Sequence, residues 1–485
     1  MLHPYSSLPK AFPLRYASLM ASDAAAILEF PALLDFLKSY LGSPLGESEL
    51  MSLRSPQDHQ AVTSRLSLAG QAREYLRQLS AGTSSPRSDS RPASAGGVLP
   101  ISFSGFPDPA PALEKLAIEG VTLELTELSD LLAFAARASD VRQALLAAPG
   151  RFALLAAEAR RMADFHSLVA DLRRKILPSG DLDDNASPQL HRIRREIEKQ
   201  RGTLLSSLKT FLRELSEDGP QQDEIITIRA DRYVVPVRAQ RKGQVKGVVH
   251  GSSSTGQTLY IEPLESIEMN NELVRLREEE AREVHHVLRE MTAHIRERVA
   301  DLDAAADCMA ALDLAFACGR YAIDYDCVIP RFSAAAAPAR LLLKDARHPL
   351  LDALMRKKSS AVVPLSLTLD DDNRILVISG PNTGGKTVAL KTVGLLALMA
   401  GSGLPVPASD AEFPRLGRIL VDIGDYQSIQ ESLSTFSAHL LNINSMMEAA
   451  GPASLVLLDE LGTATDPEEA GALGVAIVDR FRASG

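Results

Sequence analysis

One stretch of the sequence has the residue types and the spacing of a phosphate-binding loop. Residues 380–387 read GPNTGGKT and fit the pattern GxxxxGK[ST] without a gap. Glycines let backbone N–H groups turn toward phosphate oxygens, and a helix that begins near Lys386 adds the positive end of its dipole. In this pattern Lys386 reaches the β- and γ-phosphates of a nucleoside triphosphate, while the Thr387 hydroxyl binds Mg²⁺. Chance also produces the pattern, but the apolar run before it and the helical stretch after it favour function.

A second group with the right chemistry is the acidic pair in LVLLDELG, residues 455–462. Asp459 ends an apolar strand, where a carboxylate can bind the Mg²⁺ shell, and Glu460 follows at once, placed to polarise an attacking water. A glutamate beside the metal-binding aspartate favours a hydrolysing ATPase over a kinase. The absence of an Asn-Lys-x-Asp motif from the sequence argues against a GTPase.

Between these two motifs lies a cluster of hydroxyl residues that precedes an apolar helical stretch. Its members are Ser432, Ser434, Thr435 and Ser437. Such a cluster commonly caps a helix. It could equally present hydroxyl and N–H groups to a γ-phosphate that is held by a partner subunit, and the residues alone leave both interpretations open.

The elements that must position these groups fall into four regions. Residues 1–222 have helical periodicity, 223–265 alternate in the manner of strands, and 266–335 begin with a charged stretch without Pro or Gly that returns to helical core. That charged stretch predicts one helix of about forty residues, roughly 60 Å long. In 336–485 a strand over 374–380, a helix after the loop and a strand ending at Asp459 predict a parallel-sheet domain.

The expected fold is therefore multidomain. A mostly α-helical core and lever carries a small β-rich, clamp-like insert and is followed by an α/β P-loop domain of the ABC-like kind.

Composition limits the function further. The net charge is −10 and the pI about 5.6, which excludes non-specific binding of nucleic acid by the protein surface as a whole. Any contact with nucleic acid therefore requires a local basic patch. Three cysteines without CxxC spacing argue against a disulfide scaffold or a zinc site. We find no signal peptide and no membrane span, so the expected location is the cytoplasm and no membrane partner is expected.

The local basic patch is found in the β-rich insert. Its cations are Arg229, Arg232, Arg238, Arg241, Lys242 and Lys246. They could form a solvated basic face or contact the phosphate backbone of a nucleic acid. Contact of that kind is tolerant of sequence and sensitive to salt.

Several segments together resemble the MutS ATPases: GPNTGGKTVALKTVGLL, ESLSTFSAH and LVLLDELGTATDPEEAGAL, with ITIRADRYVVPVRA, HGSSSTGQTLYIEP and ARHPLL upstream in the same order. The likeness is greatest to the second bacterial MutS paralogue, the branch linked to suppression of recombination and to rescue of collided ribosomes. The resemblance implies a homodimer that uses ATP and Mg²⁺ and closes around branched or duplex DNA or a ribosome.

The resemblance also implies roles for particular residues. Glu460 is the catalytic residue, and Thr387 and Asp459 hold Mg²⁺. ATP phosphates are bound by Gly380, Pro381, Asn382, Thr383, Gly384, Gly385, Lys386 and Thr387. Ser434 and Thr435 complete the partner's site across the dimer, Gln427 senses Mg²⁺, and the adenine rests near Val363.

The sequence departs from the family pattern in two ways, and each limits which activities of the family can be expected of this chain. None of the 14 Phe residues has a Glu two places on, so the Phe-x-Glu wedge of mismatch readers is missing. The sequence also ends at Gly485, before the nuclease module of that branch, so endonuclease activity is expected only of a longer parent and the chain is expected to be cut within its ATPase domain. Two alternatives stay open: an ABC-like ATPase of chromosome structure, and a nucleotide-binding module without turnover.

Overall fold

The computed structural model describes residues 24–55, 58–83, 98–148, 150–215, 226–334, 339–380, 385–423, 432–461 and 467–483. The backbone contacts divide the chain into two compact units. Unit 1 holds the described residues within Met1–Asp108, Arg137–Ala163 and Ala304–Gly485, and unit 2 holds those within Pro109–Ala136 and Asp164–Asp303. The fold is mostly helical with small sheets and has more than one domain. The four predicted domain boundaries stay predictions.

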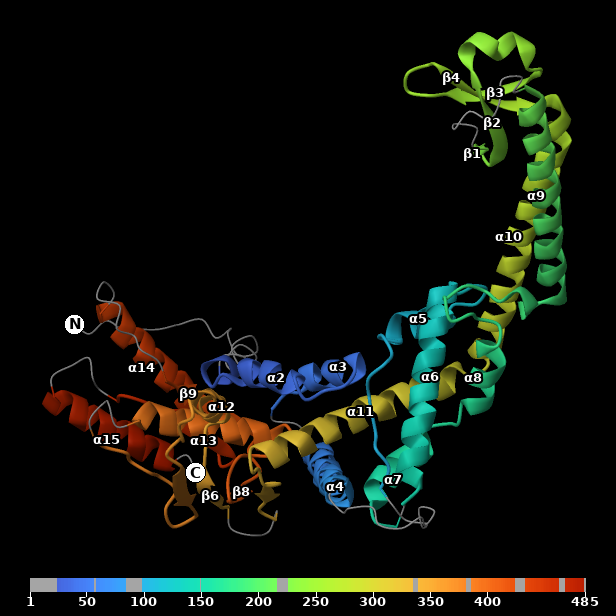
Figure 1. Ribbon diagram of the computed structural model, residues 1–485. Coiled ribbons are helices and arrows are strands. Elements are labelled where there is room, and N and C mark those ends of the chain that lie inside the picture. The colour runs from blue at the N-terminus through green and yellow to red at the C-terminus, as the bar shows by residue number, and fades with distance from the viewer. Residues whose placement is uncertain are drawn as a thin grey trace, which may run out of the picture. The chain divides into compact units, whose positions relative to one another are not determined.

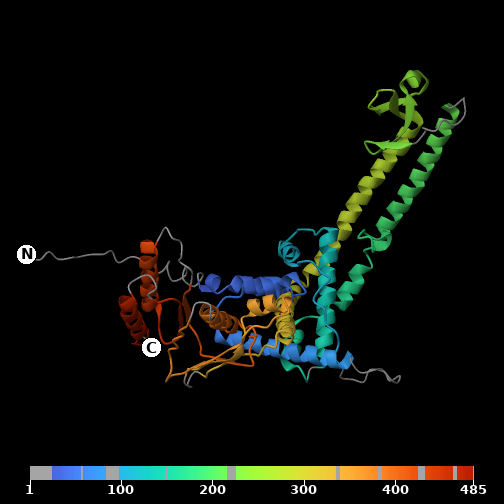
Figure 2. The same ribbon diagram turned by 60° about the vertical axis from the view of Figure 1, so that its left-hand side comes forward.

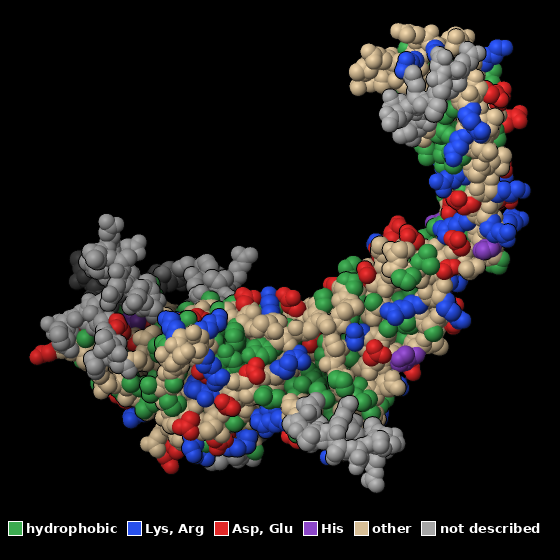
Figure 3. Space-filling view, viewed as in Figure 1, with side chains coloured by type: hydrophobic (Ala, Val, Ile, Leu, Met, Phe, Trp, Pro, Cys, Tyr) green, Lys and Arg blue, Asp and Glu red, His purple; other side chains and the backbone are tan. Residues whose placement is uncertain are grey.

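Unit 2 contains two long antiparallel helices that lie side by side (Figures 1 and 2). They are α9 (Pro188–Leu215) and α10 (Ile267–Arg296). Apolar residues recur every four positions on α9, as at Leu204, Leu208 and Leu212, and all three are buried. The exposed sides carry alternating charges (Figure 3), such as Arg275 between Glu272 and Glu279. This spacing of apolar and charged residues explains why two solvent-facing helices pair.

A four-stranded antiparallel sheet is attached to the end of this helix pair. Its order is β1 (Thr227–Arg229), β2 (Arg232–Arg238), β4 (Thr258–Pro263) and β3 (Gly247–Ser252). Tyr233, Val235 and Ile261 on one face share a core with Leu208 of α9 and Leu273 of α10. We call residues 226–264 the tip, because this sheet is joined to the helices at one end only (Figure 1). The 3₁₀ turn η2 (Ala239–Gln244) lies within the tip, and η3 (Leu264–Ser266) leads from the tip into α10.

The rest of unit 2 consists of helical elements near the end of α10 and the start of α9. They are α5 (Ala110–Leu116), the first part of α6 (Leu125–Leu146), α8 (His166–Arg173) and the turn η1 (Asp184–Ala186). Arg296 near the end of α10 donates hydrogen bonds to the carbonyls of Leu116 and Val121. These contacts hold α5 and the chain that follows it against the helix.

The predicted helix of about forty residues is wrong in length. Helix α10 has 30 residues, about 45 Å, and α11 (Val299–Asp324) begins three residues after it ends. At the break the Arg298 N–H donates to the Ile295 carbonyl, so the last turn tightens, and the Arg298 side chain binds Asp301 of α11. The break therefore arises from side-chain and backbone bonding and not from Pro or Gly.

Unit 1 is built on helices and short sheets. The helices are α2 (Phe30–Lys38), α3 (Pro44–Ser52), α4 (His59–Thr83), α7 (Ala153–Arg161), α11, α12 (Pro349–Lys357), α13 (Lys386–Gly401), α14 (Ser432–Ala449) and α15 (Pro467–Ala483). Every residue of α13 from Thr392 to Ala400 is buried, so this helix forms the centre of the main core. Of the described helices, none is both long and apolar enough to cross a membrane.

Two sheets accompany these helices. One has the order β5 (Arg331–Phe332), β8 (Asp410–Phe413), β6 (Leu341–Ala346) and β7 (Leu365–Leu369). The other pairs β9 (Arg418–Asp422) in parallel with β10 (Ser454–Leu458), with Asp422 opposite Leu458. Because parallel strands end at the same edge, the residues that follow β9 and β10 lie together.

Candidate functional site

The start of α13 brings together the described part of the predicted phosphate loop. Gly385 caps the helix in the left-handed region at φ 82°, a conformation that favours glycine, and α13 begins at Lys386. The Lys386 amino group donates a hydrogen bond to the Gly380 carbonyl over 2.7 Å. Pro381, Asn382, Thr383 and Gly384 lie outside the described residues. The N–H groups of the first helical turn and the Lys386 charge are therefore at the same helix end.

The acidic pair meets this helix end. The Thr387 hydroxyl donates to Asp459 Oδ2 over 2.6 Å, joining residues that are 72 positions apart in the sequence. Close packing holds the two elements together: a Cβ added at Gly394 of α13 would lie 2.6 Å from side-chain atoms of Leu28 and of Leu457 in β10. The glycine lets α13 approach the strand that delivers Asp459.

The two oxygens suit a divalent cation of the Mg²⁺ kind. Mg²⁺ takes oxygen ligands at about 2.0–2.1 Å in octahedral geometry, so neighbouring ligands lie about 2.9 Å apart. Thr387 Oγ1 and Asp459 Oδ2 would separate by a few tenths of an ångström to accept it. No group of three or more His, Cys, Asp or Glu side chains able to hold a metal lies within the described ranges. The pair therefore suits an ion that takes its other ligands from water and phosphate.

Glu460 has an unusual backbone. Its φ is 52°, in the left-handed region that a residue with a Cβ seldom adopts, and its N–H donates to Asp459 Oδ1 over 3.1 Å. Backbone conformations of this kind cost about 1–3 kcal/mol and cluster at functional sites. Here the turn fixes the Asp459 carboxylate from its own main chain, and both side chains remain accessible from solvent.

Sequence reasoning missed a buried carboxylate next to this pair. Asp422, at the end of β9, is 2% exposed, and its carbonyl accepts a hydrogen bond from the Asp459 N–H over 2.9 Å. Two side chains of α14 hold its carboxylate: His439 Nδ1 lies 2.6 Å from Oδ2, and Asn442 donates to Oδ1 over 2.8 Å. The close contact with the Asp422 carboxylate raises the pKa of His439 above its usual value. Helix α14 is thus fixed to the strand edge that carries Asp459.

The available signal for this contact was an aspartate at the end of the apolar run RILVD. Its partners, His439 and Asn442, are three residues apart and therefore lie on one face of α14, but nothing in the sequence links them to Asp422.

The other predicted nucleotide contacts are less well described. Gln427 lies outside the described residues, as do the side chains of Ser434 and Thr435, whose backbone belongs to α14. Val363 lies between α12 and β7 and is 89% exposed. The placement of an adenine there stays a prediction.

The strand expected over 374–380 is wrong. These residues form no strand, and the apolar side chains at 375–378 are 38–74% exposed. A strand requires a hydrogen-bonded neighbour, and the described residues place none beside this segment.

The six cations of the predicted basic patch all lie in the tip. Arg229 ends β1, Arg232 and Arg238 are the first and last residues of β2, Arg241 and Lys242 lie in η2, and Lys246 follows that turn. Arg232 donates to Glu262 over 2.7 Å and to Asn271 over 2.6 Å. Its guanidinium joins strands β2 and β4 to α10.

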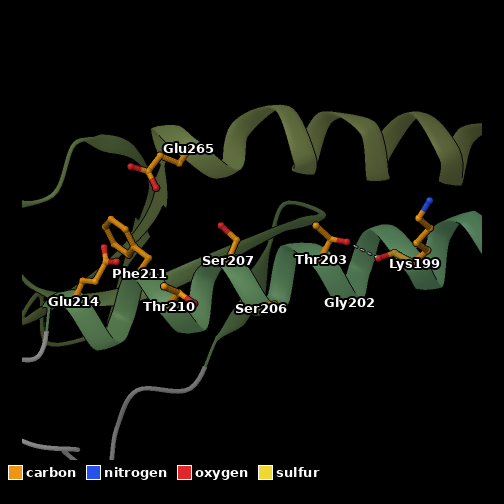
Figure 4. A pocket seen from close by; sticks show the side chains of 9 residues that line it. All are labelled: Lys199, Gly202, Thr203, Ser206, Ser207, Thr210, Phe211, Glu214 and Glu265. Carbon is orange, nitrogen blue, oxygen red and sulfur yellow. Dashed lines mark hydrogen bonds between the residues drawn. The ribbon is translucent and has the colours of Figure 1, made fainter.

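A groove in unit 2 lies apart from this site. It has a volume of about 670 Å³ and lies along α9 in unit 2, with Glu265 of η3 facing a row of hydroxyl residues (Figure 4). The Thr203 hydroxyl donates back to the Lys199 carbonyl over 3.0 Å, so it is committed to its own helix. None of the residues at the start of α13 lines this groove, and we assign it no chemistry.

Comparison with known proteins supports the family. Residues 376–484 match the family model "MutS domain V". The chain is similar to "Endonuclease MutS2" of Thermomicrobium roseum, 37% identical over 95% of this chain and 56% of that protein, and of Pelotomaculum thermopropionicum, 36% identical over 96% and 56%. It is 43% identical to that of Carboxydothermus hydrogenoformans over 65% of this chain and 40% of the relative. The chain thus spans about half the length of the curated relatives that it matches. With its phosphate-loop sequence, its acidic pair and these relatives, the chain belongs to the MutS family, on the branch of the MutS2 proteins.

Proposed function

We propose that this chain is an ATP-hydrolysing, nucleic-acid-binding clamp that works as a homodimer. Its ATPase part is an ABC-like P-loop domain over 336–485, and its clamp contact is the tip. The observation that carries the nucleotide assignment is the 2.6 Å hydrogen bond between Thr387 and Asp459 at the start of α13. This contact joins two motifs that the sequence linked to one metal ion.

The chemistry follows from the residues at this helix end. The N–H groups of α13 and the Lys386 amine bind the phosphates of ATP, and Thr387 and Asp459 hold Mg²⁺. When bound, Mg²⁺ neutralises charge that develops on the phosphate oxygens. Glu460 orients a water in line with the γ-phosphate and takes its proton as the water oxygen bonds to the γ-phosphorus. The bond from that phosphorus to the β–γ bridging oxygen breaks, and ADP and inorganic phosphate are released. Ser434 and Thr435 at the start of α14 complete the site of the partner subunit.

A pair of matched variants tests turnover. Glu460→Gln keeps the shape of the side chain and removes the proton acceptor, so we expect ATP binding to persist while hydrolysis falls at least about a hundredfold. Glu469→Gln on α15 removes the same charge from an exposed acid and should hydrolyse ATP at the wild-type rate. If wild type binds ATP and Glu460→Gln hydrolyses it equally fast, Glu460 is not the base. If wild type binds ATP without hydrolysing it, the alternative of a binding module without turnover is correct.

The nucleic-acid contact rests on charge. Residues 226–264 contain six cations and two acids, a net charge of 6 − 2 = +4 in a chain of net charge −10. Such a local excess attracts phosphate backbone. The ligand is branched DNA or the RNA of a stalled ribosome, and the setting that we propose is the cytoplasm. The endonuclease activity in the relatives' name belongs to proteins almost twice as long.

A triple substitution tests the tip. Replacing Arg238, Arg241 and Lys242 with Ala should weaken binding to every nucleic-acid sequence and reduce the salt slope of log K by about 2–3. The control removes three exposed cations from unit 1: Lys357, Lys358 and Arg374. Both variants change the net charge equally. If the two triple substitutions change the salt slope equally, the tip cations do not contact the nucleic acid more than other surface cations do.

A further inference from the structure

The two faces of the tip sheet have different partners. Successive side chains of a strand point to opposite faces, and Tyr233, Val235 and Val237 of β2 enter the core shared with α9 and α10. The opposite face, which we call the outer face, therefore carries Arg232, Val234, Pro236 and Arg238 of β2. Of these, Val234 is 0% exposed. By register, Pro236 pairs with Tyr260 of β4, so Tyr260 belongs to the outer face as well.

A cation and an aromatic ring meet on this outer face. The Arg229 guanidinium lies 4.6 Å from the centroid of the Tyr260 ring, in cation–π contact. Arg229 is exposed and Tyr260 is partly exposed, so the pair is accessible. Arg229 comes from β1 and Tyr260 from β4, with β2 between them, and the pair thus spans the middle of the sheet.

The charge of the outer face is positive. Its acid, Glu262, is 2% exposed and accepts a hydrogen bond from Arg232 over 2.7 Å, while His250 Nε2 lies 2.7 Å from its second oxygen. Its negative charge is therefore compensated within the sheet. Arg238 lies at the end of β2, and Val248 of edge strand β3 adds an apolar side chain that is 45% exposed. The outer face thus combines the flat groups of Arg229 and Tyr260, the apolar side chain of Val248 and the positive charge of Arg238.

We propose that the outer face binds an unpaired nucleotide, whose base stacks on the Arg229–Tyr260 pair while neighbouring phosphates contact Arg238. The proposal rests on the proposed nucleic-acid contact of the tip and specifies its substrate class. In a duplex both faces of an internal base are covered by its neighbours, so the tip could contact phosphates, sugars and groove edges but could not stack on that base. An unpaired base offers a free face, and stacking on aromatic rings or guanidinium planes is how proteins bind such bases. Junctions, bulges and folded RNA contain bases of this kind.

The test compares single-stranded and duplex probes. Labelled dT20 and rU20 and a blunt 20-base-pair DNA duplex are titrated with the whole chain at fixed salt, and binding is followed by fluorescence anisotropy. Tyr260→Ala should lose about tenfold or more in affinity for the single strands and little for the duplex, because one stacking contact is removed. Tyr260→Phe keeps the ring and should bind as wild type does. The dT20 and rU20 arms decide whether the nucleotide is DNA or RNA.

A second variant guards against loss of the fold. Arg229→Lys keeps the charge of an exposed residue but removes the planar group, and should lower single-strand affinity selectively as well. Unchanged single-strand affinity in both variants, or an equal loss for single strands and duplex, overturns the stacking proposal and leaves the charge contact standing. Failure of the wild type to bind any of the three probes would instead overturn the proposed nucleic-acid contact itself.

Discussion

His439→Ala should loosen α14 from the strand edge that carries Asp459. The substitution leaves Asp422, 2% exposed, with the hydrogen bond from Asn442 and without its cationic partner. Removing one partner of a buried ion pair costs about 3–5 kcal/mol. We expect about 3 kcal/mol, the lower end of that range, because the His439 side chain is 15% exposed.

Hydrogen exchange measures this loss locally, which suits a chain of several domains. A cost of about 3 kcal/mol predicts that amides of β9 and of Asn442–Ala449 exchange on the order of a hundredfold faster than in wild type. The tip amides, in unit 2, should be unaffected.

The same contact predicts a pH dependence of known sign. Because the folded pKa of His439 lies above the unfolded value of about 6.5, its stabilisation is fully present below about pH 6.5 and is lost as the pH rises through the folded pKa. Protection of β9 should therefore fall over that window in wild type and stay flat in His439→Gln. His286→Gln, on the exposed side of α10, is the control. The reasoning is refuted if His439→Gln shows wild-type protection with the wild-type pH profile.

Three further outcomes are expected. Thr387→Val should weaken Mg²⁺-dependent ATP binding about tenfold or more, and Thr387→Ser should restore it, as calorimetry with and without Mg²⁺ would reveal; equal affinities would remove Thr387 from the metal site. Asn270→Ala breaks two hydrogen bonds to the Tyr233 backbone, of 2.9 and 3.0 Å, and should destabilise the tip by about 2–4 kcal/mol in hydrogen exchange without altering ATP affinity; unchanged tip protection would contradict this. Burial raises the pKa of the Cys308 thiol to about 11, so alkylation of the native chain at pH 8 should be at least about tenfold slower than after unfolding; equal rates would mean that the thiol is accessible.

The part of the nucleotide site that could be predicted from the sequence consists of residues in short local motifs. Lys386, Thr387 and Asp459 follow from short patterns whose chemistry is independent of distant packing, and the structure brings the last two within 2.6 Å. The alternation in 223–265 likewise predicts strands, because one face of that sheet must enter a core with α9 and α10.

What the sequence could not provide depends on partners that are far apart in the chain. The charged stretch after Ser266 reads as one helix, but its end at Arg296 is set by bonds of Arg298. Arg232 reads as one more surface cation, yet it is engaged by Glu262 thirty positions away. Residues 374–380 read as a strand from their apolar types, while strand formation depends on a neighbour.

The central claim is that the start of α13 holds the phosphates of ATP, and nucleotide binding to Lys386→Ala tests it most directly. The affinity for ATP is measured by calorimetry in the presence of Mg²⁺, with Lys357→Ala, an exposed lysine of α12, as the matched control. The proposed function predicts that Lys386→Ala lowers ATP affinity at least about a hundredfold, because the charge facing the β- and γ-phosphates is removed, while Lys357→Ala binds as wild type does. Equal ATP affinity in wild type and Lys386→Ala would contradict it.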